Sequence, residues 1–181
     1  MHLDNPTAFS PAECDRIVAL ARARAMEPAT VHGAGGDEIV PAQRRAERCH
    51  IARDADTGWL FERLDSLFAE AAARLGAVAD PVFEAIQVVR YGVGDHFQSW
   101  HSDAGTDRHR QRQVSLSVEL SEPGDHDGGA LEIVPGTLGM PRTLPKGGAR
   151  LFLSRAIHRV TPVTRGERWA LVAWTGQASG R

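Results

Sequence analysis

The chain has 181 residues, enough for one domain to bury most of its apolar surface and too few for two full domains. Its formal net charge of -2 gives no overall basic field, so nucleic acid is not an expected partner. Cys14 and Cys49 stand far apart without CxxC spacing, which argues against a cysteine zinc site and against a disulfide framework.

The N-terminal residues 1–6 lack a basic region followed by an apolar run, and no stretch of about eighteen consecutive apolar residues occurs anywhere. We therefore expect a cytoplasmic protein with no membrane partner.

Two helices are predicted within the first eighty residues. The run from Ser10 to Glu13 combines an N-cap serine, a proline at the first helical position and a glutamate placed to close a capping box. Apolar residues then recur at helical spacing as far as Ala21. A second helix is predicted over 59–75, where the apolar residues keep the helical period and Gly76 follows.

The segment between these helices has weaker signals. Residues 28–43 show little periodicity and contain His32-Gly-Ala-Gly-Gly-Asp37, which indicates a loop or irregular edge and a candidate flap. Residues 44–51 are interpreted as a short edge strand, and 53–57 as a turn.

After Pro81 the hydrophobic period changes from helical to two, which is typical of half-buried strands. Short strands separated by glycine and proline turns indicate an antiparallel sandwich or barrel. We expect one α+β domain, mainly β, over 1–181, with 1–80 as helical support and edge strands and 81–176 as the β core. The predicted strands are 83–91, 114–120, 130–134, 149–153, 158–163 and 168–175.

His101 and Asp103 are the first two candidate metal ligands. If the stretch from Tyr91 to Asp103 ends in a strand, the two side chains point to the same side of the sheet, because strand side chains alternate. His158, arriving from another strand, would supply a third ligand. Two imidazoles and one carboxylate on one face of a metal form the ligand set of non-haem Fe(II) oxygenases.

Each of these residues also has an ordinary structural explanation. His-x-Asp is a weak motif, and His2-Leu3-Asp4 matches it a second time at the terminus. His158 taken alone is better explained as a hydrogen-bonded core histidine, and only its combination with His101 and Asp103 favours a metal ligand. Asp103 on a mainly apolar face would be costly to bury unpaired, whereas a bound metal compensates its charge.

Arg168 opens the last predicted strand ten residues after His158. If it faces the interior, its fixed fork of donors suits a carboxylate, such as one from a dicarboxylate cosubstrate. Pairing with a structural acid such as Glu167 or Glu132 is the alternative. Arg159 and Arg165 are rival candidates for the clamp, although their positions favour side chains that point away from the site.

Together these segments resemble the Fe(II)- and 2-oxoglutarate-dependent oxygenases, in their prolyl 4-hydroxylase-like branch. The resemblance covers roughly half of the chain, from about Glu84 to Trp174. It rests on Gln87-Val-Val-Arg-Tyr91, Trp100-His-Ser-Asp103, Gly128-Gly-Ala-Leu131 and the run from His158 to Trp169.

The resemblance implies a double-stranded β-helix, or jelly roll, with supporting N-terminal helices. It also implies that His101, Asp103 and His158 ligate Fe(II), that Arg168 binds the far carboxylate of 2-oxoglutarate, and that Tyr91 lines the cosubstrate pocket. Fe(II), 2-oxoglutarate and O2 are the expected cofactors, and ascorbate is a candidate addition.

The activity implied is hydroxylation of an unactivated C–H in a prolyl, amino-acid-like or natural-product substrate, small or peptidyl, with succinate and CO2 as coproducts. Asp103 favours hydroxylation over halogenation, because a small residue there would leave room for a halide. A non-catalytic jelly-roll binding module and a metal-dependent oxygenase that does not use 2-oxoglutarate are the alternatives. The oligomeric state is left open.

The sequence also departs from the family pattern. Phe97 stands where relatives often have a second tyrosine, one extra residue precedes His101, and Tyr91 is the sole tyrosine. Residues 104–113 form a polar, basic segment that is either a lid or a solvated loop. Trp100, Trp174 and Phe97 are candidate cavity walls, and Ser115, Ser117 and Thr161 are candidates for the missing tyrosine's hydrogen bonds.

Overall fold

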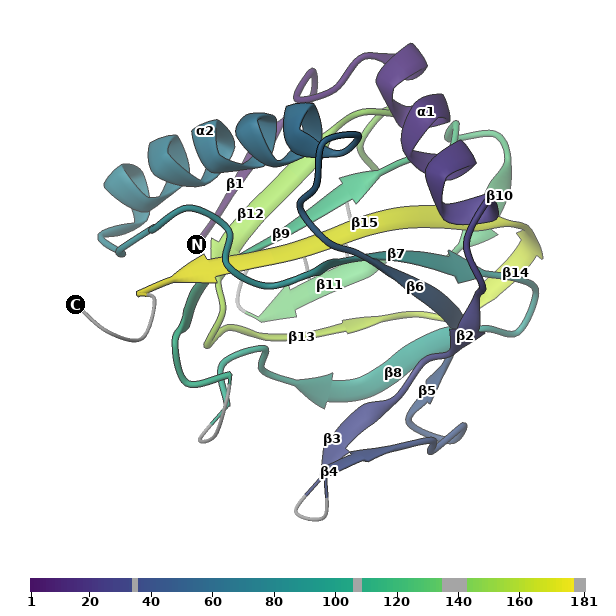
Figure 1. Ribbon diagram of the computed structural model, residues 1–181. Coiled ribbons are helices and arrows are strands. Elements are labelled where there is room, and N and C mark those ends of the chain that lie inside the picture. Colours follow the sequence, from purple (N-terminus) through teal and green to yellow (C-terminus); the bar gives the residue numbers. More distant parts are fainter. Residues whose placement is uncertain (34–35, 106–108, 135–142, 178–181) are drawn as a thin grey trace.

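The computed structural model describes residues 1–33, 36–105, 109–134 and 143–177. Within this part, two sheets face each other and two helices cover the outer face of the larger one (Figure 1). The fold is the expected jelly roll, mainly β, with N-terminal helices in support. Neither helix is long and apolar enough to cross a membrane.

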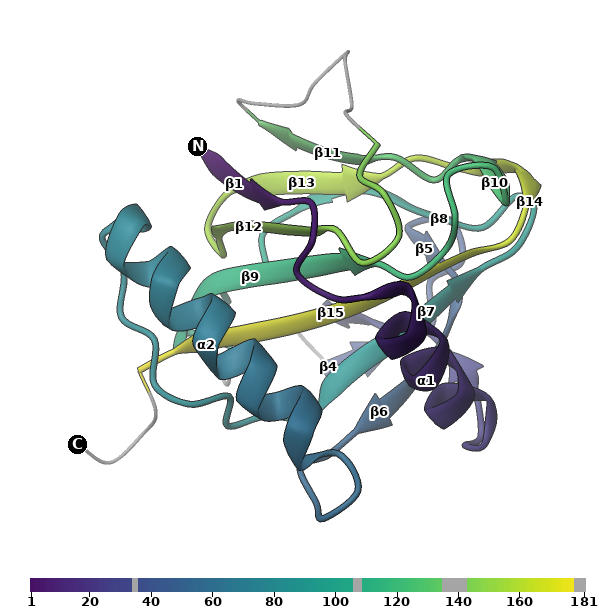
Figure 2. The same cartoon turned by 90° about the horizontal axis from the view of Figure 1, so that it is seen from above.

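The helices begin and end where local chemistry predicts. Helix α1 (Pro11–Arg22) has Ser10 as its N-cap, and the Ser10 and Glu13 side chains close a capping box. Helix α2 (Gly58–Leu75) ends at Gly76, which adopts the left-handed conformation with φ 67°. Both helices lie on the same side of the larger sheet, as the view from above shows (Figure 2).

The larger sheet has seven strands in the described part of the chain, in the order β1-β12-β9-β15-β7-β6-β2. The strands are β1 (His2–Asn5), β12 (Ala149–Leu153), β9 (Arg112–Glu119), β15 (Arg168–Gly176), β7 (Ile86–Tyr91), β6 (Glu47–Ile51) and β2 (Glu27–Pro28).

The smaller sheet has the order β11-β13-β8-β5, and two two-stranded sheets, β10–β14 and β3–β4, complete the described strands. The strands of this sheet are β11 (Leu131–Val134), β13 (Ile157–Val160), β8 (His96–His101) and β5 (Arg44–Arg45). The strands of these two pairs are β10 (His126–Gly128) with β14 (Val163–Gly166), and β3 (Val31–Gly33) with β4 (Gly36–Glu38), which form a hairpin.

Strand β15 separates the core from the cavity, as its alternation predicts. Trp169, Leu171 and Ala173 belong to the apolar core under the helices. On the opposite face, Arg168 and Trp174 line the space between the two sheets. Every second residue of this strand is therefore available to a site between the sheets.

Two predicted segments differ from the structure. Residues 28–43, interpreted as an irregular loop, contain the short hairpin of β3 and β4. The single strand predicted over 158–163 is two strands, β13 and β14, with Thr161 and Pro162 between them. Proline has no N–H to donate to a ladder, which explains the break.

Candidate metal centre

His101 and His158 lie side by side on neighbouring strands of the smaller sheet. His101 is the last residue of β8, and the antiparallel register of β8 and β13 places it directly opposite His158. Asp103 lies just beyond β8, not within it, so strand alternation does not place its side chain as expected. Instead the Asp103 N–H donates to the Ser154 carbonyl at 2.9 Å, which turns the chain back toward the histidines.

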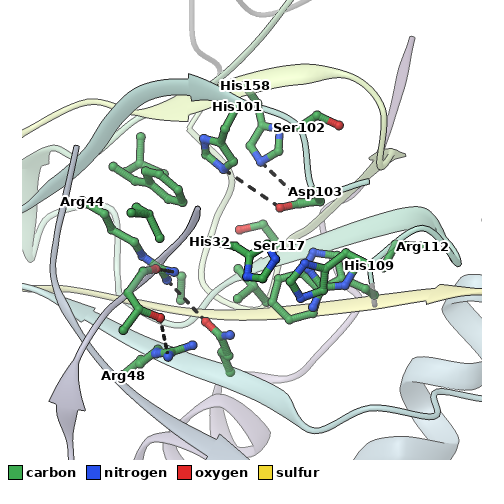
Figure 3. A pocket seen from close by; sticks show the side chains of 18 of the residues that line it. His32, Arg44, Arg48, His101, Ser102, Asp103, His109, Arg112, Ser117 and His158 are labelled. Carbon is green, nitrogen blue, oxygen red and sulfur yellow. Dashed lines mark hydrogen bonds and ion pairs between the residues drawn. The ribbon is translucent and has the colours of Figure 1, made fainter. Parts of the chain in front are cut away.

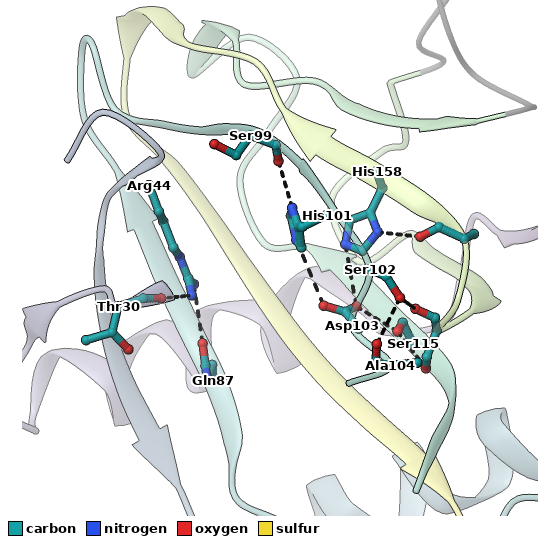
Figure 4. A network of polar contacts seen from close by, with 12 residues as sticks. Thr30, Arg44, Gln87, Ser99, His101, Ser102, Asp103, Ala104, Ser115 and His158 are labelled. Atoms are coloured by element: carbon teal, nitrogen blue, oxygen red, sulfur yellow. Dashed lines mark hydrogen bonds and ion pairs between the residues drawn. The ribbon is translucent and has the colours of Figure 1, made fainter. Parts of the chain in front are cut away.

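The three side chains converge on one point (Figure 4). His158 Nε2 lies 3.5 Å from Asp103 Oδ2, and His101 Nε2 lies 4.0 Å from Asp103 Oδ1. One ligand atom from each residue lies within 4.8 Å of the other two. Small side-chain rotations are therefore enough to bring all three onto a single ion.

Backbone carbonyls hold both imidazoles in the tautomer that a metal requires. His101 Nδ1 lies 2.9 Å from the Ser99 carbonyl, and His158 Nδ1 lies 3.0 Å from the Ala156 carbonyl. A carbonyl can only accept, so each Nδ1 carries a proton, and each Nε2 is the ring nitrogen that faces Asp103 and is placed to bind a metal. Metal-ligating histidines almost always donate such a hydrogen bond from the ring nitrogen that does not bind the metal.

The buried residue Ser115 orients the Asp103 carboxylate. The Ser115 hydroxyl donates to Asp103 Oδ2 at 2.7 Å and lies 2.9 Å from Ser154 Oγ. Burial raises the pKa of Asp103, but His158, His101 and the Ser115 bond outweigh it, and the net shift is downward.

His101 is also held in its metal-binding protonation state. Burial, followed by the charge of His158, lowers the pKa of His101 to about 4. Near neutral pH the site therefore presents the Asp103 carboxylate and a neutral His101 imidazole. These donors fit a divalent transition metal such as Fe(II).

The triad forms one wall of a cavity of about 1090 Å³ between the two sheets (Figure 3). The predicted wall residues Phe97, Trp100 and Trp174 all line it. The Phe97 ring stacks on His101 with 3.7 Å between centroids.

Arg168 and Tyr91 also line this cavity, as expected. The acid paired with Arg168 is neither Glu167 nor Glu132 but buried Glu119, whose Oε2 accepts from Arg168 Nε at 2.9 Å. No described residue bonds to the two terminal nitrogens of Arg168. The guanidinium lies 5.5 Å from the centre of the Tyr91 ring. Glu119 thus fixes the guanidinium of Arg168 through Nε and leaves the two terminal nitrogens available to a ligand.

The three residues predicted to replace the hydrogen bonds of the missing tyrosine differ in their positions. Ser115 supports Asp103, Ser117 lines the cavity, and the Thr161 hydroxyl instead accepts from the Ala130 N–H at 2.9 Å. Of the candidate lid over 104–113, residues 106–108 lie outside the described chain, whereas 109–112 line the cavity.

Sequence reasoning missed two residues of the cavity region, Glu119 and Arg44. Glu119 alternates with the apolar residues of the predicted strand 114–120 and was not identified as a site residue, yet it is only 9% exposed. Arg44 was placed on an edge strand, yet it is equally buried and lines the cavity. No local signal distinguishes either residue from a surface charge.

A jelly roll that brings two histidines and an aspartate to the wall of an internal cavity defines a class of mononuclear metal-binding proteins. The sequence model of the 2OG-Fe(II) oxygenase superfamily matches residues 86–176, nearly the span of the resemblance noted above. The chain belongs to this superfamily.

Individual relatives agree with this assignment. A PKHD-type hydroxylase of Methylobacterium nodulans is 31% identical over 186 residues, covering 94% of this chain and 75% of the relative. A PKHD-type hydroxylase of Synechococcus sp. (strain JA-2-3B'a(2-13)) is 35% identical over 101 residues, covering 54% of this chain and 45% of the relative. This chain thus spans less than half the length of that second relative.

Among solved structures, a Pseudomonas putida prolyl-4-hydroxylase has a TM-score of 0.77 at 20% identity, covering 98% of this chain and 93% of its own. This likeness establishes the shared fold.

Proposed function

We propose that the protein is an Fe(II)- and 2-oxoglutarate-dependent dioxygenase that hydroxylates an unactivated C–H bond. One observation carries the proposal. Two histidines fixed by their Nδ1 contacts and one buried aspartate converge on the wall of a cavity that an interior arginine also lines.

In this proposal His101, Asp103 and His158 hold Fe(II) on one face and leave the opposite face open to the cavity. Bound Fe(II) supplies the site at which 2-oxoglutarate chelates and O2 is activated. Arg168 binds the far carboxylate through its terminal nitrogens, and Tyr91 forms part of the wall beside it. The Glu119 contact supports this role, because it restricts the arginine to one orientation before the cosubstrate arrives.

The substrate class proposed is prolyl, amino-acid-like or natural-product, with succinate and CO2 as coproducts. The PKHD-type names of the sequence relatives support this choice. Ascorbate is proposed as an accessory reductant that keeps the iron as Fe(II). We propose a cytoplasmic location without nucleic-acid or membrane partners. Free Cys14 and Cys49 support this, because thiols stay reduced in that compartment.

The test is aerobic turnover of 2-oxoglutarate, with and without added ascorbate. Purified protein with Fe(II) should convert 2-oxoglutarate to succinate in the presence of O2, and candidate substrates should raise this rate above the uncoupled background. His158→Ala should give no succinate. His2→Ala, in the other His-x-Asp, should behave like the wild type. Succinate formation that survives His158→Ala would exclude the proposed ligand set.

A further inference from the structure

The cavity contains a second buried arginine, Arg44, for which the proposed function has no use. Arg44 lies on β5 of the smaller sheet and reaches across toward the larger one (Figure 4). Its Nη1 donates to the Thr30 carbonyl at 3.0 Å, and its Nη2 donates to Gln87 Oε1 at 3.3 Å. Its guanidinium lies 4.8 Å from the centre of the Phe97 ring.

These partners are neutral, and no carboxylate of the described residues forms an ion pair with Arg44. Its Nε is buried and has no hydrogen-bond partner. The adjacent Arg45 shows the ordinary arrangement, because it is largely exposed and its Nε lies 3.0 Å from Asp95 Oδ1. Tyr91 and the Asp103 carboxylate attract Arg44 electrostatically, but Asp103 forms no ion pair with it. A buried cation without a direct anionic partner is costly, so a ligand carboxylate would supply that partner.

The cavity lining as a whole favours an anion. Its described residues include five arginines but only three acids. Two of the acids are already engaged, since Glu84 pairs with Arg112 at 2.5 Å and Asp103 belongs to the metal triad. An excess of positive charge around a low-dielectric cavity raises the local concentration of anionic ligands.

The position of Arg44 places its ligand next to the metal centre. Arg44 pairs in register with Phe97, and the Phe97 ring separates its guanidinium from His101. A 2-oxoglutarate molecule has two carboxylates, one to chelate the metal and one for the open fork of Arg168. Arg44 is then left for an acid on a second molecule.

We propose that Arg44 binds a carboxylate of the primary substrate, so that the substrate is a small molecule with a free acid group and not an internal residue of a peptide chain. This inference rests on the proposed function. A carboxylate of 2-oxoglutarate would satisfy Arg44 equally well, and the experiment distinguishes the substrate carboxylate from that of the cosubstrate.

The experiment compares Arg44→Met with Arg45→Met, which removes the neighbouring exposed arginine of the same strand. The probes are cyclopentanecarboxylate and the neutral, nearly isosteric cyclopentanecarboxamide, added to protein saturated with Mn(II) and 2-oxoglutarate. Binding is followed by tryptophan fluorescence, because Trp100 and Trp174 line the cavity. A parallel anaerobic titration with Fe(II) measures 2-oxoglutarate affinity through the visible absorption of the chelate and shows that each variant is folded.

The wild type and Arg45→Met should bind the acid about 10- to 100-fold more tightly than the amide, as expected for a charged hydrogen bond in a buried site. Arg44→Met should lose this preference, and Arg44→Lys should keep part of it. All variants should bind 2-oxoglutarate within about twofold of one another.

Four outcomes overturn the inference. In the first two, the wild type binds acid and amide equally well, or binds neither. In the third, the preference for the acid survives Arg44→Met. In the fourth, Arg44→Met alone weakens 2-oxoglutarate binding tenfold or more, which assigns the carboxylate to the cosubstrate. Failure of the proposed function is a different result, namely no chelate absorption in the wild type.

Discussion

Ser115→Ala should weaken metal binding without removing any ligand. The Ser115 hydroxyl donates to Asp103 Oδ2 at 2.7 Å, and Ser115 itself is 1% exposed, so water does not replace the lost donor readily. A hydrogen bond to a charged group contributes about 1.5–3 kcal/mol. At about 1.4 kcal/mol per factor of ten, Fe(II) affinity should fall about 10- to 100-fold.

The assay is an anaerobic Fe(II) titration of the 2-oxoglutarate-loaded protein. Ser117→Ala is the matched control, because Ser117 lies on the same strand and lines the same cavity without a hydrogen bond to the triad. Ser115→Thr, which keeps a hydroxyl, should retain most of the affinity. Equal Fe(II) affinity in Ser115→Ala and the wild type would refute the idea that Ser115 orients Asp103.

Three further predictions concern the arginine clamp and the triad. Glu119→Ala leaves buried Arg168 without its acid, which should cost about 3–5 kcal/mol and lower the Tm by about 10 °C in a thermal melt; an unchanged Tm would contradict the pairing. Gly129→Ala would place a Cβ 2.9 Å from Arg168 Cδ, at a φ of 65° that favours glycine, and so displace the arginine. The affinity for 2-oxoglutarate should therefore fall at least tenfold in the chelate titration. The control Gly124→Ala, at a position with open space around it, should leave this affinity unchanged. Burial lowers the pKa of His101 from 6.5 to about 4, so between these values the unfolded chain binds a proton on this imidazole and the folded metal-free protein does not. The stability of the metal-free protein should therefore fall as the pH decreases from 6.5 to 4, and more steeply in the wild type than in His101→Gln, as pH-dependent melts would show.

The predictable parts of the molecule are those with local or periodic causes. Ser10 and Gly76 mark helix ends because caps satisfy backbone groups next to them in sequence. The face of β15 that carries Arg168 follows from alternation alone. His101 and His158 could be paired as ligands because the spacing of metal donors restricts the choices, and the structure brings them into register. Their role as Fe(II) ligands stays a prediction, as does the division of 1–181 into one domain with two parts.

The unpredictable parts depend on contacts between distant segments. The Glu119–Arg168 pair joins residues 49 apart, and Gln87 meets Arg44 across 43 residues. Charged residues on strands are exposed by base rate, and only the packing of the two sheets determines which of them are enclosed. The hydrogen bond from the Asp103 N–H to the Ser154 carbonyl is equally non-local. The sequence therefore predicted correctly that Asp103 meets the two histidines, but it attributed this to strand alternation.

The most direct test of the central claim is the visible absorption of the Fe(II)–2-oxoglutarate chelate under anaerobic conditions. The wild type should show the band, and His158→Ala should not. Arg168→Ala should need at least about 100-fold more 2-oxoglutarate while binding Fe(II) normally, since two charged hydrogen bonds are lost. Absence of the band in the wild type, or loss of Fe(II) binding in Arg168→Ala, would contradict the assignment of the triad to the metal and of Arg168 to the cosubstrate.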